Sequence, residues 1–89
     1  MPEREVIIVN RRGLHARAAA KFVKLAQSFE AAVSVEKAGT AVSGLSIMGL
    51  MMLAATPGTL LMLRAEGPAA EAALDALDRL VADGFDEGD

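Results

Sequence analysis

The spacing of hydrophobic positions changes several times along the chain, and each change predicts an element. Residues 6–9 form a wholly β-branched apolar run that Asn10 and an Arg-Arg-Gly turn close, which is typical of a buried strand. Over residues 16–29, apolar side chains recur every three or four positions. This spacing predicts an amphipathic helix. Another face of the helix carries a polar, mainly basic stripe of Arg17, Lys21, Lys24 and Ser28.

A hairpin and a short helix are predicted next. Val33 and Val35 alternate with polar residues, as in a half-buried strand. Gly39 allows a tight turn before a second short strand at residues 41–42. Ser46 then stands immediately before a run of apolar or glycine residues, 47–55, where its hydroxyl can accept from the free N–H groups of a first helical turn. We therefore predict a helix over residues 47–55 with Ser46 as its N-cap.

The last third of the chain predicts one strand and one helix. The strand spans residues 59–66, between a Thr-Pro-Gly and a Gly-Pro break. The helix that follows has Gly84 as its C-cap. Its inner face is formed by Ala70, Ala73, Leu74, Leu77, Leu80 and Val81. The element order is β-α-β-β-α-β-α, which predicts an α+β two-layer domain with four strands in one sheet and the helices on a single face.

Composition narrows the class of protein. A length of 89 residues predicts one domain, residues 1–89, with no room for a linker. With no Cys and one His, we expect neither disulfides nor a metal site. The longest apolar run, residues 47–55, is too short to cross a bilayer, and the N-terminus shows no leader pattern. We expect a cytoplasmic protein with no membrane partner.

Charge is unevenly distributed along the chain. The net charge is −3 and there is no Trp or Tyr, which argues against nucleic acid as a partner. Residues 1–37 hold seven basic and four acidic residues, whereas residues 66–89 hold one Arg and eight acids. The basic end can attract a negative group or an acidic partner. Ordinary solvated faces are the alternative explanation.

His15 is the only imidazole, and it lies between Gly13 and the first turn of the predicted helix. A helix N-terminus binds anions such as phosphate, and Gly13 lets the backbone come close to one. The helix dipole also disfavours imidazolium, which leaves a ring nitrogen free as a nucleophile. Arg17 adds a planar guanidinium suited to phosphoryl oxygens. Together these features predict a phosphohistidine site. A partly exposed histidine beside a basic helix remains the alternative.

The predicted helix at residues 47–55 is apolar on every side, so one face of a thin sheet cannot cover all of it. We assign Leu50 and Leu53 to the core. A methionine-rich surface can adapt to several partners. The residues expected at such a docking patch are Ile47, Met48, Met51 and Met52. Self-association and ordinary core packing are the alternatives.

Two motifs resemble those of the HPr family, the histidine-containing phosphocarriers of the bacterial phosphotransferase system. Residues 13–19 read Gly-Leu-His-Ala-Arg-Ala-Ala, which resembles the family signature Gly-Leu-His-Ala-Arg-Pro-Ala. Residues 46–50 read Ser-Ile-Met-Gly-Leu, which resembles a second signature around a regulatory serine. The motifs occur at the family's usual separation, and the resemblance covers residues 4–85.

The resemblance implies an open-faced β-sandwich, in which a four-stranded antiparallel sheet carries three helices on one face. It also implies that His15 accepts a phosphoryl group from enzyme I and passes it to enzyme IIA domains. Ser46 would be the substrate of HPr kinase/phosphorylase. We expect a covalent carrier rather than an enzyme, working as a monomer without a cofactor.

Particular residues are expected to serve this transfer. The backbone N–H groups of Ala16 and Arg17, together with the Arg17 side chain, would bind the phosphoryl oxygens. Arg12 would add positive charge where many relatives carry a small polar residue. Lys21 and Lys24 would dock an acidic partner. A non-catalytic regulatory module, switched by Ser46 phosphorylation, is the alternative function.

Two further features bear on the resemblance. Ala18 stands where the family usually has Pro, so the first helical turn lacks that preset backbone angle. Residues 84–87, Gly-Phe-Asp-Glu, resemble the acidic end of the nitrogen-branch carrier NPr. A sugar-uptake role and a regulatory, nitrogen-type role therefore both stay open.

Overall fold

Four strands form one antiparallel sheet in the computed structural model, which describes residues 2–87. The strands are β1 (Glu3–Ile7), β2 (Ala32–Lys37), β3 (Thr40–Ser43) and β4 (Leu60–Glu66). Their order across the sheet is β1-β4-β2-β3. Glu5 pairs with Met62, and Val35 lies between Leu63 and Val42. The last strand in sequence therefore lies between the first two, and β1 and β3 form the edges.

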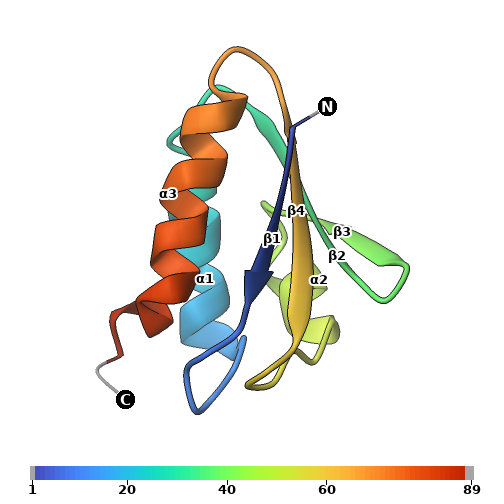
Figure 1. Cartoon of the computed structure of the whole chain (residues 1–89), viewed down its shortest axis with the longest axis vertical. Helices are drawn as coiled ribbons and strands as arrows, with labels where there is room; N and C mark the ends of the chain where they lie inside the picture. The colour runs from blue at the N-terminus through green and yellow to red at the C-terminus, as the bar shows by residue number, and fades with distance from the viewer. Residues whose placement is uncertain (1, 88–89) are drawn as a thin grey trace.

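The helices lie against this sheet and against one another (Figure 1). They are α1 (Ala16–Ala26), α2 (Ile47–Met52) and α3 (Ala70–Ala82), and a 3₁₀ turn, η1 (Gly84–Asp86), follows. Figure 1 shows α1 and α3 side by side, with α1 beginning at the end of the molecule where α3 finishes. The predicted fold class and element order are confirmed. The 3₁₀ turn is an addition to them.

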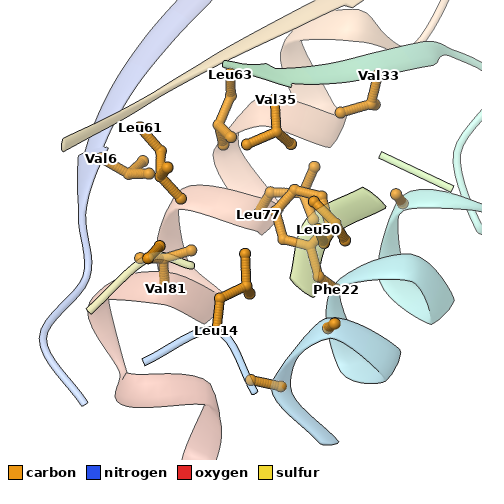
Figure 2. Close-up of a cluster of buried hydrophobic side chains, with 14 of the residues drawn as sticks. Val6, Leu14, Phe22, Val33, Val35, Leu50, Leu61, Leu63, Leu77 and Val81 are labelled. Carbon is orange, nitrogen blue, oxygen red and sulfur yellow. The ribbon is translucent and has the colours of Figure 1, made fainter. Parts of the chain in front are cut away.

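The core fills the space between the sheet and the helices. Strand side chains alternate between the two faces of the sheet, so Val6, Leu61 and Leu63 point toward the helices. Figure 2 shows Leu50 of α2 lying against Phe22 of α1. All five side chains are at most 4% exposed, and the buried hydrophobic side chains of residues 2–87 are aliphatic except for Phe22 and Phe85.

The predicted buried strand at residues 6–9 is partly wrong. β1 begins earlier, at Glu3, and its pairing with β4 ends at Ile7. Val6 and Ile8 are buried, whereas Ile7 and Val9 are 49% and 55% exposed. The reason is that helices cover only one face of the sheet, so alternate residues of an edge strand face outward.

The ends of all three predicted helices need correction. The helix expected over residues 16–29 ends at Ala26, and the one expected over 47–55 ends at Met52. In the second case Ala54 has a positive φ of 52°, which turns the chain out of the helix. The C-cap of α3 is Asp83 rather than Gly84. Gly84 follows with a φ of 64°, the left-handed conformation that commonly ends a helix.

Candidate functional site

The loop between β1 and α1 is held in place by backbone hydrogen bonds. Gly13 has a φ of 65°, and its N–H donates to the Asn10 carbonyl at 3.1 Å. The next N–H, that of Leu14, donates to the carbonyl of Ala55 at 3.0 Å, while the Leu14 side chain is buried. These contacts leave His15 in an extended conformation as the N-cap of α1.

The two nitrogens of the His15 ring have different partners. Nδ1 accepts a hydrogen bond from the backbone N–H of Arg17 at 3.3 Å. Nε2 is hydrogen-bonded to a carboxylate oxygen of Glu87. An ionised carboxylate can only accept hydrogen bonds, so Nε2 must carry the ring proton and donate it to Glu87. Nδ1 then carries the lone pair, which accepts from the Arg17 N–H. The available nucleophile is therefore Nδ1, which faces the first turn of α1.

Glu87 is itself held by a buried amide. Asn10 is 1% exposed, and its Nδ2 donates to Oε1 of Glu87 at 3.0 Å and to the Gly13 carbonyl at 2.8 Å. Burial by itself raises the pKa of Glu87. The hydrogen bonds from His15 and Asn10, with the positive charge of Arg12, outweigh that effect, so the pKa lies below its ordinary value. Glu87 is therefore ionised at neutral pH.

Positive charge surrounds this arrangement. A cavity of about 360 Å³ opens beside His15 and Glu87, and its basic lining residues are Arg11, Arg12, Arg17 and Lys21. The structure thus brings together His15 and all the predicted phosphate-binding residues, since Ala16 begins α1 next to His15. The arrangement can attract an anion and bring it to Nδ1.

The two predicted docking lysines have different environments. Lys21 is part-buried, and its Nζ donates to the carbonyl of Phe85 at 2.7 Å. Lys24 lies one turn further along α1 and is exposed. Lys21 thus links the C-terminal segment to α1 through a hydrogen bond. Of the two lysines, Lys24 has the side chain that is accessible to a partner.

The second predicted motif forms the start of α2. The Ser46 hydroxyl accepts from the Gly49 N–H at 2.9 Å, which confirms it as the N-cap. Leu50 and Leu53 are buried, as expected. The four residues predicted at the docking patch, here called the α2 patch, are Ile47, Met48, Met51 and Met52, with exposed fractions of 41%, 75%, 43% and 81%. Since α2 packs against α1, the patch belongs to the helix next to the one that His15 caps.

Sequence reasoning did not predict roles for Asn10 and Glu87. Asn10 was interpreted only as the end of a strand, and residue 87 only as part of an acidic end. The hydrogen bond between Glu87 and His15 joins positions 72 residues apart, so no local spacing could have indicated it.

Two kinds of site are absent from residues 2–87. That range contains no cluster of three or more His, Cys, Asp or Glu side chains that could hold a metal ion. Within the same described range, every helix is too short or too polar to span a membrane.

Comparison with known proteins identifies the family. A family model described as "PTS HPr component phosphorylation site" matches residues 2–83. The chain belongs to the HPr family of phosphocarrier proteins. Phosphocarrier protein HPr of Pseudomonas putida is 50% identical to it over the whole of both chains. Phosphocarrier protein NPr of Shewanella violacea is 44% identical over 96% of this chain and 93% of that protein.

A solved structure supports the assignment of the HPr fold. The crystal structure of HPr-C-His from Thermoanaerobacter tengcongensis matches with a TM-score of 0.93 at 42% identity, and the match covers 98% of each chain. The family is one of phosphocarriers in the phosphotransferase system, as the two motifs indicated.

Proposed function

We propose that residues 1–89 act as one carrier domain, which accepts a phosphoryl group on Nδ1 of His15 from enzyme I and passes it to enzyme IIA domains. The observation that carries this proposal is the geometry of the ring. Nδ1 has its lone pair directed at the N-terminus of α1, and the ring lies beside a cavity lined by Arg12 and Arg17. A helix N-terminus and guanidinium groups are both suited to bind a phosphoryl group.

The transfer follows from this arrangement. The Nδ1 lone pair forms the new bond to phosphorus, and the donor's bond to phosphorus breaks, with its electron pair staying on the donor. In the free protein the Arg17 N–H donates a hydrogen bond to the Nδ1 lone pair. Once that lone pair bonds phosphorus, the N–H donates to a phosphoryl oxygen instead. The proton on Nε2 remains there throughout. Transfer to an acceptor runs the same steps in reverse.

The decisive test is phosphorylation in vitro. The chain is incubated with enzyme I and phosphoenolpyruvate, with enzyme I left out as the control. We expect an acid-labile phosphorylated species, since phosphohistidine hydrolyses in acid. A non-catalytic regulatory module would give no such species, and that result would refute the carrier proposal.

Three properties stay predictions: a cytoplasmic location, a monomeric state, and a role in either the sugar or the nitrogen branch of the phosphotransferase system.

Arg17 and Lys24 are expected to act at different steps. Arg17→Ala removes a guanidinium beside the phosphoryl group, so it should slow transfer roughly 100-fold even at saturating enzyme I. Lys24→Ala removes an exposed charge, so it should raise the half-saturating enzyme I concentration roughly threefold, and more at low ionic strength. Transfer rates are measured across a salt titration. Equal salt dependence for both variants would contradict this division.

Phosphorylation of Ser46 is expected to block docking without unfolding the domain. A phosphate at this N-cap lies at the positive end of the α2 dipole, so phosphorylation should cost the fold little stability. A partner that covers the α2 patch, however, must remove water from the phosphate, and this weakens docking. Ser46→Asp should therefore raise the half-saturating enzyme I concentration roughly fivefold.

The matched control is Ser46→Asn, because Asn has the same shape as Asp and is an equally good N-cap. Thermal unfolding and phosphorylation rates are measured for both variants. We expect their free energies of unfolding to agree within about 0.5 kcal/mol. Equal phosphorylation of the two variants at subsaturating enzyme I would contradict the electrostatic mechanism.

A further inference from the structure

The C-terminal segment is folded back over the candidate site. After α3, Gly84, Phe85 and Asp86 have positive φ values of 64°, 56° and 61°, which reverse the chain. Positive φ is uncommon for Phe and Asp, so other contacts must hold the segment there. The Phe85 side chain is fully buried, and its carbonyl accepts from Lys21 Nζ at 2.7 Å. These contacts place the next residue, Glu87, beside His15.

Both carboxylate oxygens of Glu87 are used. Oε1 accepts from the buried amide of Asn10, and Oε2 is hydrogen-bonded to Nε2 of His15. The Glu87 side chain is only 12% exposed, against 23% for His15. The same Asn10 amide group also binds the Gly13 carbonyl, so one buried side chain links the loop before His15 to the carboxylate beyond it.

We propose that Glu87 is a positioning residue for phosphoryl transfer, which holds the proton on Nε2 and stabilises the positive charge that the ring gains when Nδ1 bonds phosphorus. The proposal rests on the proposed function of His15. When Nδ1 forms that bond, both ring nitrogens are substituted and the ring becomes a cation. A carboxylate hydrogen-bonded to the opposite nitrogen stabilises this cation and keeps the ring oriented, as carboxylates do for catalytic and metal-binding histidines.

The surrounding charges explain why a carboxylate is needed here. The loop contributes Arg11 and Arg12, and α1 contributes Arg17 and Lys21. Among the described residues that line the cavity, these four cations face only one carboxylate besides Glu87, that of Asp86. These groups attract the phosphoryl group, but they also disfavour a cationic ring at the same place. Glu87 lies beside Nε2, on the side of the ring away from Nδ1, and its negative charge offsets this destabilisation of the cationic ring.

The test compares two substitutions that each remove one negative charge. Glu87→Gln keeps a neutral acceptor next to Nε2. Asp83→Asn is the matched control, because Asp83 is exposed, has an ordinary φ of −85° and does not line the cavity beside His15. At saturating enzyme I, we expect the transfer rate to fall about tenfold in Glu87→Gln and less than about twofold in Asp83→Asn. Equal rates in the two variants would overturn the proposal.

A spectroscopic measurement separates positioning from a merely structural role. In the wild-type protein and in Asp83→Asn, the Nε2–H proton should give a downfield NMR resonance that is protected from exchange by Glu87. In Glu87→Ala this resonance should be lost to exchange with water. Equal exchange in wild type and Glu87→Ala would also overturn the proposal. This readout needs no phosphate donor. If wild type took no phosphate, the carrier function would fail, while the resonance would still show whether Glu87 holds the proton on Nε2.

Discussion

His15→Ala should abolish phosphorylation by enzyme I and phosphoenolpyruvate. The substitution removes Nδ1, and residues 2–87 contain no second imidazole to replace it. The cavity, its arginines and the first turn of α1 stay in place, so an anion can still be attracted to the site. Attraction without a nucleophile gives no covalent product, and the acid-labile phosphate signal should therefore fall to background.

The fold should survive this substitution. His15 is partly exposed, and its loss removes a capping hydrogen bond to α1 and the hydrogen bond to Glu87. Together these losses should cost about 2 kcal/mol. Thermal unfolding checks this expectation. Ser46→Ala is the matched control, because it removes the side-chain capping bond of α2 and keeps His15. An undiminished acid-labile signal in His15→Ala would place the acceptor elsewhere in the chain.

Gly13→Ala should cause a large loss of stability. Gly13 has a φ of 65°, and a Cβ added there would lie 2.2 Å from the carbonyl oxygen of Ala55. That carbonyl also accepts the Leu14 N–H, so it cannot move away without breaking this bond. We expect about 3 kcal/mol of destabilisation from the clash and the strained φ together. The melting temperature should fall by roughly 15 °C.

The control for Gly13→Ala is Gly39→Ala. Gly39 also has a positive φ, of 90°, but an added Cβ would meet nothing within 4 Å. This variant carries backbone strain without a clash, so it should lose only about 1 kcal/mol. Because the Gly13 loop positions His15, Gly13→Ala should also slow phosphorylation at temperatures where it is folded. Similar melting temperatures for the two variants would contradict the expected close contact with Ala55.

Local patterns predicted the elements well, because they reflect interactions between residues close in sequence. The N-cap at Ser46 depends on a hydrogen bond to a residue three positions away. The exposure of Met48 and Met52 followed from a helix that is apolar on every side. Where the predictions were wrong, the deciding factor lay outside the local pattern. Within residues 2–87, no helix covers the face of the sheet on which Val9 lies, and just after α2 the Ala55 carbonyl accepts from the N–H of Leu14 in the loop before α1.

The sequence by itself determined the order of the elements, the two motifs and the position of His15 at the start of a helix. These features depend on spacing, capping and turn residues, which act within a few positions. Only the tertiary structure decided that β4 lies between β1 and β2, and that Glu87 binds the ring of His15. Both results depend on how distant segments pack. The second requires α3 to lie along the sheet and Phe85 to be buried, so that the chain turns back to the loop where it began.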